Sequence, residues 1–587
     1  MEKHINVSDF REMVAEIALL RPRLTNQETE IVDVEIRAMR ALFAKGDFVT
    51  LAEIQRSVKS GVKGWITGHE LLNRTHHLSG KGCLASNLGI CTFSDTLVKN
   101  GLSLSTGAKF PLIVSQGHLA PAFYVARFLY DSFPLSFLYT LHSVLPGVVT
   151  EKWGFCNSLN RPLGVGLSDC VGRAMSEWLS GGDKKTYNCL VGDGELQEGI
   201  SFELLSLISK YRLPINVILN KNGFGIGSID DGMDYVSLSK ALNFQVDAIC
   251  GEDAPTILET YERINADNSS VPRLVILSTT KGIRHFDQTS GCTLTNSRHS
   301  FSASKIGENR GSHIMGSAMC EKLSGVPHTI VSPDLAQRFG LHTVRVINTG
   351  VRENSSILMF LGFPEGHKKI IATDDQFFSY GLGAIEQLVT ADVRNLWIVA
   401  SKNWGIWNGG NFFINQALEF DGLVLLEPHS KTEINACLDF GVRTELNIVF
   451  SVFDSDFTDH EPAFPMDLFK LNPVRVMHGK IKAVVMFGFA GRYLVDLMLL
   501  DADSDYFYVN SFPIPREEIE KLNRYEDVVF VEFNRSRSGV FSRFLPYLFG
   551  IRTKLIGADE TFLFRPENQQ ISHQGLDLRS ILSAVSS

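Results

Sequence analysis

Short apolar runs alternate along this chain with longer stretches in which apolar residues recur at helical spacing. Residues 187–191 (Tyr-Asn-Cys-Leu-Val) have the pattern of a buried strand, residues 198–211 have helical spacing, and residues 215–219 (Ile-Asn-Val-Ile-Leu) form the next apolar run. Alternation of this kind predicts a βαβ unit with parallel strands. The chain is therefore expected to be an α/β protein with mostly parallel sheets.

The same alternation restarts twice, which predicts three α/β domains. We expect them at residues 1–300, 301–476 and 477–587, with a helical extension over about the first 60 residues. A helix in this extension is expected to start within residues 26–30, and the Ser- and Gly-rich residues 300–316 are expected to be a linker. Later strands are expected at residues 274–280, 343–347, 369–372, 396–400, 481–486, 506–509 and 528–533, with a helix over 492–500.

Composition narrows the class of protein. The 587 residues are 44% hydrophobic, which is enough for several cores, and the net charge of −9 argues against a nucleic-acid partner. Nine cysteines without a Cys-x-x-Cys pair indicate reduced thiols in a cytoplasmic protein. The N-terminus lacks the apolar core of a signal peptide. Residues 123–149 are apolar but interrupted by Arg127, Asp131 and His142, so they are expected in the core and not in a membrane.

One glycine-rich turn carries the strongest chemical signal. The run Val191-Gly-Asp-Gly-Glu-Leu-Gln-Glu-Gly199 places Asp193 directly after the first strand of the βαβ unit, and Asn222 follows the second strand. Both are expected in the crevice where α/β sheets bind ligands. A carboxylate, an amide oxygen and phosphate oxygens suit Mg²⁺, and glycines let backbone N–H groups approach a phosphate. Taken alone, Gly-Asp-Gly is also a common strand-to-helix turn.

These residues resemble the thiamin-diphosphate motif, and Gly-Glu-Leu-Gln-Glu-Gly resembles the transketolase family in particular. The resemblance implies that Asp193, Asn222 and the backbone oxygen of Phe224 bind Mg²⁺ or Ca²⁺. It also implies that the Gly194 N–H donates to the diphosphate, with Gly192 and Glu195 beside the cofactor. The three domains would then be the pyrophosphate-binding, pyrimidine-binding and C-terminal domains of the family. Its two-fold interface implies a homodimer with two shared sites.

A helix start in the second expected domain supplies the residue that would activate the cofactor. Glu353, in Asn348-Thr-Gly-Val-Arg-Glu-Asn354, is expected where a strand ends and a helix begins. The run resembles the family's Gly-Ile-Arg-Glu-His, with Asn354 in place of the usual His. The resemblance implies that Glu353 hydrogen-bonds the aminopyrimidine ring and favours the tautomer that forms the ylid. Without the resemblance, Glu353 is a carboxylate stabilised by a helix dipole.

Further segments resemble parts of the family's cofactor site. His118, in Ser115-Gln-Gly-His118, and His299 would be catalytic histidines on the diphosphate side. Leu163, Phe377 and Tyr380 would contact the pyrimidine ring, although an aromatic pair at this spacing is also typical of core packing. Asp334 would lie near the cofactor across the subunit interface.

The resemblance weakens where a sugar phosphate would bind. Lys81 or Cys83 stands where the family keeps a histidine after an early Ser-Gly. Pro146-Gly-Val148 lacks the imidazole of the family's Pro-Gly-His-Pro, and an arginine expected near residues 453–455 is absent.

One basic residue is kept from the family pattern, because Arg310 matches a family phosphate-binding arginine. Arg338 and Lys402 could supply replacement positive charge, although each of these two is also compatible with a surface position. We therefore expect the cofactor to bind and ordinary pentose phosphates to be poor substrates.

The sequence thus predicts a thiamin-diphosphate- and Mg²⁺-dependent transferase of transketolase type. It would move a two-carbon ketol or acyl unit from a ketone or 2-oxo donor to an aldehyde or other acceptor. Residues 82–89 resemble deoxyxylulose-phosphate synthases as much as they resemble transketolases. A decarboxylating reaction with pyruvate or another 2-oxo acid is therefore one alternative. Transfer to a carrier protein is another. The last alternative is a non-catalytic transketolase-like protein with a structural or regulatory role.

Overall fold

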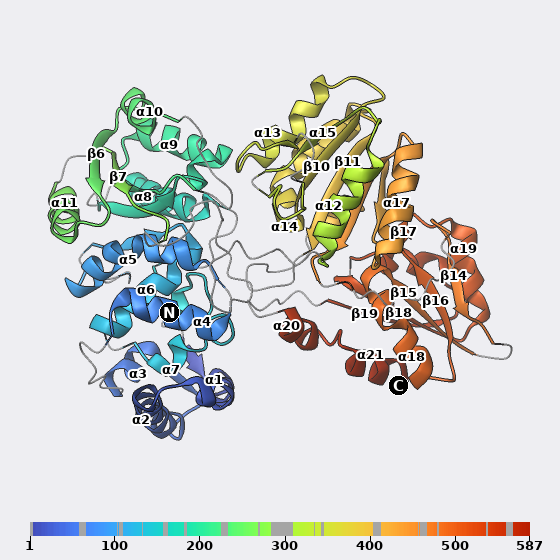
Figure 1. Cartoon of the computed structure of the whole chain (residues 1–587), viewed down its shortest axis with the longest axis horizontal. Coiled ribbons are helices and arrows are strands. Elements are labelled where there is room, and N and C mark those ends of the chain that lie inside the picture. The colour runs from blue at the N-terminus through green and yellow to red at the C-terminus, as the bar shows by residue number, and fades with distance from the viewer. Residues whose placement is uncertain are drawn as a thin grey trace. The chain divides into compact units, whose positions relative to one another are not determined.

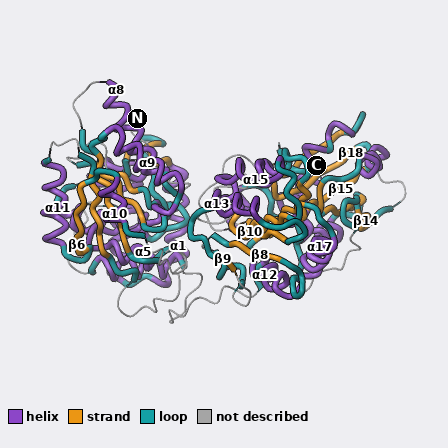
Figure 2. Tube along the Cα trace, turned by 90° about the horizontal axis from the view of Figure 1, so that it is seen from above, coloured by secondary structure: helices purple, strands orange, loops and turns teal. Residues whose placement is uncertain are grey.

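Two compact units make up the chain, Met1–Ser304 and Lys305–Ser587. Each contains a mostly parallel sheet with helices on both faces, which confirms the α/β class (Figures 1 and 2). The computed structural model describes residues 4–57, 66–80, 82–102, 104, 110–131, 133–156, 163–180, 185–224, 233–267, 271–282, 309–333, 335–341, 346–402, 413–455, 457, 467–477, 481–535, 538–558 and 567–586.

The first unit is built on a five-stranded parallel sheet of order β3-β4-β5-β7-β6. Successive side chains of its strands alternate between two cores: Leu190 joins one, and Cys189 and Val191 join the other. Helices α5, α6 and α11 cover the first face, and α8, α9 and α10 cover the second. The bounds are β3 Leu112–Val114, β4 Tyr187–Gly192, β5 Ile215–Lys221, β6 Gln245–Cys250, β7 Arg273–Ser278, α5 Leu84–Lys99, α6 Ala120–Tyr130, α8 Val165–Ser180, α9 Gly199–Tyr211, α10 Tyr235–Ala241 and α11 Ala254–Ala266.

The N-terminal extension is helical, as expected, but it also contains a short antiparallel strand pair that the pattern did not predict. The helix expected to start within residues 26–30 is α2, and its N-cap is Thr25, one residue earlier. The Thr25 side chain accepts from the N–H of Glu28, whose carboxylate accepts from the N–H of Thr25, a reciprocal capping box. The elements are β1 His4–Asn6, α1 Val7–Leu20, α2 Asn26–Phe43, β2 Phe48–Thr50, α3 Leu51–Ser57, α4 Gly68–Ser79 and α7 Leu135–Leu138.

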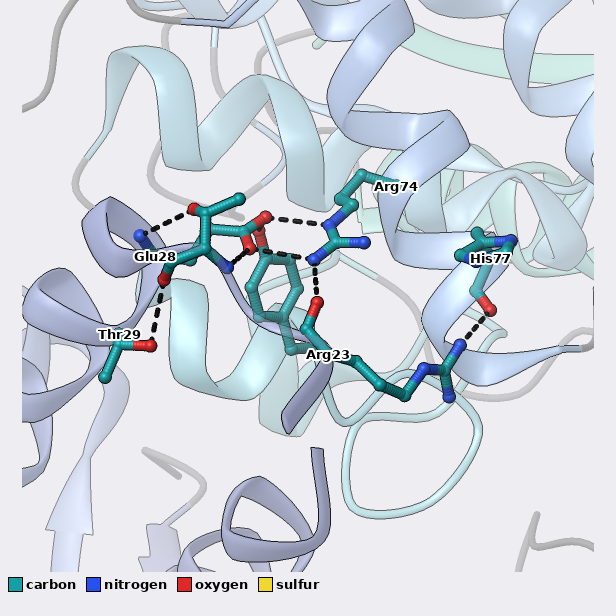
Figure 3. Close-up of polar contacts among 7 residues, drawn as sticks. Arg23, Glu28, Thr29, Arg74 and His77 are labelled. Atoms are coloured by element: carbon teal, nitrogen blue, oxygen red, sulfur yellow. Dashed lines mark hydrogen bonds and ion pairs between the residues drawn. The ribbon is translucent and has the colours of Figure 1, made fainter. Parts of the chain in front are cut away.

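Glu28 also ties the extension to the rest of the first unit (Figure 3). Its carboxylate accepts from Nε and Nη2 of Arg74, both at 2.8 Å, and from the hydroxyl of Tyr139 at 2.6 Å. Arg74 donates in addition to the carbonyl of Arg23. Burial alone would raise the pKa of Glu28, but the hydrogen bonds from Arg74, Tyr139 and the Thr25 N–H outweigh it and lower that pKa to about 2.

This lowered pKa predicts an acid-sensitive first unit. The ionised form of Glu28 is more favourable in the folded than in the unfolded protein. Its contribution to the free energy of unfolding is therefore complete above pH 4.5 and is lost as the pH falls toward about 2. The contribution amounts to about 2–3 kcal/mol. Urea denaturation at a series of pH values should show this loss in the wild type and a flatter profile in Glu28→Gln. The exposed Glu30→Gln change in the same helix serves as control and should leave the profile unaltered.

The second unit holds two sheets, one of seven strands (β17-β12-β13-β11-β10-β8-β9) and one of five (β14-β16-β15-β18-β19). In the larger sheet β10 pairs in parallel with β8 and β11, and β11 with β13. Helices α12 and α17 share one core with Trp397 and Val399 of β11, whereas α13, α15 and α16 share the other with Ile398. The helices are α12 Gly311–Lys322, α13 Glu353–Leu358, α14 Asp375–Phe378, α15 Leu382–Thr390, α16 Phe413–Ala417, α17 Lys431–Arg443, α18 Leu494–Leu500, α19 Arg516–Glu520, α20 Glu567–His573 and α21 Leu578–Ser586.

Most strands expected from the pattern are present with shifts of one or two residues at their ends. The helix expected over 492–500 is α18, preceded by a 3₁₀ turn over Gly488–Tyr493. Of the strand expected at 343–347, the described part is β9. The strands of the second unit are β8 His328–Val331, β9 Val346–Ile347, β10 Lys368–Asp374, β11 Leu396–Lys402, β12 Leu423–Leu426, β13 Asn447–Phe453, β14 Asn472–Arg475, β15 Lys482–Phe487, β16 Asp505–Val509, β17 Ser511–Phe512, β18 Asp527–Arg535 and β19 Arg552–Ala558.

The prediction of a linker over residues 300–316 is wrong for its last part, because residues 311–316 lie within α12. Its other residues up to 308 lie outside the described part of the chain. The domain border expected at 476/477 stays a prediction. The strands of the seven-stranded sheet come mainly from before this border, and those of the five-stranded sheet mainly from after it. The exceptions are β14, which precedes the border but lies in the smaller sheet, and β17, which follows it but pairs with β12 of the larger sheet. Within the described residues, no helix combines the length and apolar character needed to cross a membrane, and no disulfide is formed.

Candidate functional site

The turn after β4 brings Asp193 against the backbone that follows β5. Strands β4 and β5 run in parallel register, with Gly192 opposite Asn220, so both end at the same edge of the sheet. The Asp193 carboxylate accepts from the N–H groups of Asn222 at 2.9 Å and Gly223 at 2.7 Å, and from its neighbour Gly194 at 2.9 Å. The carboxylate and the amide residue singled out from the sequence are therefore neighbours in the fold.

The metal ligands expected from the resemblance surround this turn. The side-chain oxygen of Asn222 accepts from the N–H of Phe224 at 3.0 Å. The carbonyl oxygen of Phe224 lies 3.5 Å from Nζ of Lys281, which follows β7 at the same edge of the sheet. Burial raises the pKa of Asp193, although the three N–H groups and the ammonium of Lys281 oppose the rise. The set offers one carboxylate and two neutral oxygens beside a cationic side chain.

The side chain of Glu195 holds the glycine-rich turn after β4 in place. Its buried carboxylate accepts from the N–H of Gly164 at 2.8 Å, from the N–H of Gly192 at 3.2 Å, and from the hydroxyl of Ser115. Burial raises the pKa of Glu195, and these three donors oppose the rise. Gly164 follows the half-buried Leu163, so one carboxylate fixes both the Leu163 loop and the glycine-rich turn.

Gly192 has a steric reason to be glycine. A Cβ atom at this position would lie 2.0 Å from the side-chain nitrogen of Gln116. Gln116 in turn accepts from the side-chain amide of Asn220 at 3.2 Å. The close approach therefore packs the segment that carries His118 onto the ends of β4 and β5.

His118 is neutral in this environment. Burial is the main cause that lowers its pKa to about 4, and the positive charge of Lys281 lowers it further. Its imidazole can thus donate or accept a hydrogen bond but carries no charge at neutral pH. Lys281 is a cationic side chain at this edge of the sheet, close to the Phe224 carbonyl. Sequence reasoning missed it because a Lys shortly after a strand has no distinctive spacing, and Phe224, which it contacts, is 57 residues away in the chain.

The residues present fit a divalent ion held partly by a phosphorylated cofactor. Asp193, Asn222 and the Phe224 carbonyl provide oxygen atoms of the kind that Mg²⁺ and Ca²⁺ prefer, and the remaining positions would be filled by phosphate oxygens. Among the residues that the structure describes, no group of three or more His, Cys, Asp or Glu side chains could hold a metal by itself. A metal at this turn would therefore depend on the ligand's phosphates, and the backbone N–H of Gly194 lies beside it.

In the second unit, Glu353 is the first residue of α13, as the pattern predicted, and its side chain is 2% exposed. Phe377 and Tyr380 are both half-buried, with ring centroids 6.0 Å apart, whereas the core position of this segment is taken by Phe378. Phe377 also packs against the other core of this unit, so the pair remains compatible with core packing. The cofactor roles of these three residues stay predictions.

The expected substrate residues have partners within the chain. Cys83 is half-buried directly before α5. Arg310 and Arg338 both bind Asp454, and Lys402 is fully buried against Glu427. None of the three basic residues is therefore a simple surface charge. Their substrate roles, and that of Cys83, stay predictions, and His299, Asp334 and Lys81 lie outside the described residues.

Sequence comparison finds relatives with a shared name. The chain is 33% identical over 179 residues to an apulose-4-phosphate transketolase subunit of Actinobacillus succinogenes, a match that covers 29% of this chain and 64% of the relative. It is 30% identical over 181 residues to transketolase-like protein 2 of Bos taurus, covering 29% of this chain and 28% of the relative. The chain thus spans less than two thirds of the length of these curated relatives.

Other comparisons are weaker. No protein-family model matches the chain. A transketolase structure from Campylobacter jejuni aligns with 88% of this chain and 98% of its own at 16% identity and a TM-score of 0.41, too low a likeness to support any inference. Transketolase of Buchnera aphidicola is 32% identical over 157 residues, 24% of either chain. In these matches, at most 29% of this chain is similar to proteins named transketolase or transketolase-like.

Proposed function

We propose that the chain is a transferase of transketolase type that uses thiamin diphosphate and a divalent metal ion. The observation that carries the proposal is the turn after β4, where Asp193 accepts from the N–H groups of Asn222 and Gly223. The two residue types that a Mg²⁺–diphosphate needs are thereby neighbours at the edge of the sheet where α/β proteins bind ligands. The similarity to transketolases supports the reaction class.

Each residue of this edge has a part in holding the cofactor. Asp193, Asn222 and the Phe224 carbonyl bind the metal ion. The ammonium of Lys281 would face the negative charge of the diphosphate, and neutral His118 would offer it a hydrogen bond. The N–H of Gly194, which donates to the Asp193 carboxylate in this structure, would turn to the diphosphate when the cofactor binds. Glu195 is a positioning residue, because its carboxylate is occupied by N–H groups of the loop and by Ser115.

When bound, thiamin diphosphate supplies a nucleophilic carbon and accepts the electron pair of the broken carbon–carbon bond. Glu353 would hold a proton at the aminopyrimidine ring of the cofactor, and Phe377 and Tyr380 of the same unit would lie beside that ring. The group transferred is a two-carbon ketol or acyl unit, passed from a ketone or 2-oxo donor to an aldehyde or other acceptor. The active assembly is a homodimer.

Isothermal calorimetry with thiamin diphosphate tests the cofactor proposal. Wild type should bind the cofactor with Mg²⁺ and lose most of that affinity in EDTA. Asn222→Ala should weaken Mg²⁺-dependent binding by about a hundredfold. In this variant the Asp193 carboxylate keeps its hydrogen bonds to the backbone N–H groups of residues 222 and 223, and the hydrogen bond from the Phe224 N–H to the Asn222 side chain is lost. Asp33→Asn, which removes an exposed ion pair with Arg21, is the matched control. Absence of Mg²⁺-dependent binding by wild type would refute the proposal.

A further inference from the structure

Two arginines of the second unit converge on one buried carboxylate. Asp454 directly follows β13, and its side chain is 1% exposed. Its Oδ2 atom accepts from Nη1 of Arg310 at 2.8 Å and from Nη2 of Arg338 at 2.6 Å, and the Ser312 hydroxyl donates to Oδ1. Paired guanidinium groups are common protein ligands for phosphate. Here the anion between the two arginines is part of the chain itself.

The cluster contains a second carboxyl group, that of Asp374, whose pKa is raised by burial although the charge of Arg338 opposes the rise. Nη1 of Arg338 also donates to Oδ2 of Asp374 at 2.7 Å, so two guanidinium groups face two carboxyl groups. Burial alone would raise the pKa of Asp454, but the charges of Arg338 and Arg310 outweigh it and hold that pKa below its ordinary value. Asp454 is therefore ionised at neutral pH. We call these four residues the arginine–aspartate cluster.

The cluster lies at the carboxyl edge of the seven-stranded sheet. Asp374 is the last residue of β10 and Asp454 follows β13, and both strands run in parallel with β11, one on each side. The Asp454 N–H donates to the carbonyl of Lys402, the last residue of β11, at 2.8 Å. Ligands of α/β sheets bind at this edge, so the cluster occupies a position suited to ligand binding.

The backbone fixes Arg310 beside Asp454. The N–H of Gly311 donates to the carbonyl of Ser455 at 3.1 Å. A Cβ atom on Gly311 would lie 2.2 Å from the carbonyl oxygen of Phe453, so α12 can start this close to the end of β13 because residue 311 is glycine. Arg310 immediately precedes this contact. Its guanidinium is therefore held at the cluster by the fold and by the ion pair together.

We propose that Asp454 is a specificity-determining residue, an internal counter-anion that fills a two-arginine site and prevents a phosphate group from binding there. A carboxylate attached to the chain competes with a diffusing phosphate at a high effective concentration. The site therefore selects against phosphorylated substrates and in favour of non-phosphorylated carbonyl compounds. This statement about substrates rests on the proposed function, whereas the statement about the anion site does not.

Titration with inorganic phosphate in the calorimeter, without thiamin diphosphate, tests the anion site. The wild type should show no phosphate binding that depends on Arg338, so Arg338→Gln should leave its titration unchanged. Asp454→Asn leaves both guanidinium groups without their shared carboxylate, so its affinity for phosphate should rise about tenfold or more over that of the wild type. Phosphate should also raise the melting temperature of this variant more than chloride at equal ionic strength.

Two further variants serve as controls. The double variant Asp454→Asn/Arg338→Gln removes one charge of each sign, so it should bind no phosphate at the arginine–aspartate cluster. Asp439→Asn, which removes the surface partner of Lys322, should behave as wild type. If Asp454→Asn does not fold, Asp454→Ser carries the same test with a smaller side chain. Phosphate binding by the wild type that Arg338→Gln weakens, or a folded Asp454 variant without any gain in phosphate affinity, would overturn the proposal.

Activity assays then separate this inference from the proposed function. If the chain binds thiamin diphosphate, the wild type should prefer the non-phosphorylated form of a sugar donor over its phosphorylated form, and Asp454→Asn should reduce or reverse that preference. A protein that ignores thiamin diphosphate but gains phosphate affinity in Asp454→Asn would refute the proposed function alone. A catalytically competent protein without that gain would refute the inference alone.

Discussion

Replacing Glu353 by glutamine is expected to lower kcat by about 10²- to 10⁴-fold, the usual contribution of a positioned acid–base group. The amide keeps the size of the side chain but cannot exchange a proton with the aminopyrimidine ring of the proposed cofactor. Because Glu353 is no part of the proposed metal site, Mg²⁺-dependent binding of thiamin diphosphate should remain. The loss should therefore appear in kcat and in hydrogen–deuterium exchange at the thiazolium carbon of the cofactor, which NMR measures directly.

The segment around Glu353 has hydrogen bonds of its own. The loop before α13 is held by its own contacts: Nη1 of Arg352 donates to the carbonyl of Thr349 at 2.6 Å, and the Thr349 and Ser356 hydroxyls are 2.7 Å apart. Neither of these two contacts involves the Glu353 carboxyl group. The melting temperature of Glu353→Gln, measured beside the exposed control Glu386→Gln on α15, reports any structural effect of the substitution and separates it from the loss in kcat. Full activity of a folded Glu353→Gln protein would remove this residue from the mechanism.

The βαβ unit could be predicted from sequence because its signals are local. The apolar runs that became β4 and β5 carry their own period, and parallel pairing then places Asp193 and Asn222 at one edge without any knowledge of distant contacts. The start of α13 at Glu353 was predictable for the same reason. In each case the residues that decide the structure lie within one strand–turn–helix segment.

The missed features depend on partners far apart in the chain. Residues 311–316 were expected in a linker because Gly and Ser are frequent there, yet Gly311 is required by its close approach to Phe453, more than a hundred positions away. The pair β1–β2 joins segments on either side of α1 and α2. Lys281 gains its place at the candidate site from Phe224, and the arginine–aspartate cluster joins four segments. No local pattern carries such contacts.

Lys402 is the clearest example of a residue whose place depends on partners far away in the chain. Its surroundings predict a large loss of stability when it is replaced. Its ammonium donates to the carboxylate of Glu427 and, at 2.7 Å, to the side-chain oxygen of Asn534 on β18. The Ser451 hydroxyl donates to the same carboxylate at 2.9 Å. Both charged side chains are 0% exposed. This ion pair therefore joins β11 and the end of β12 in the larger sheet to β18 in the smaller one.

The Lys402→Met variant is expected to lose about 3–5 kcal/mol of the free energy of unfolding, because it leaves the Glu427 carboxylate buried without its countercharge. Adding Glu427→Leu should recover much of that loss, since an apolar pair of similar size avoids burying an unpaired ion. Hydrogen exchange of the β11 and β13 amides in increasing urea measures the change within this unit. As a control, Lys322→Met breaks the partly exposed pair with Asp439 and should cost about 1 kcal/mol or less. A double variant that is no more stable than Lys402→Met would mean that shape, and not charge, governs this contact between the two sheets.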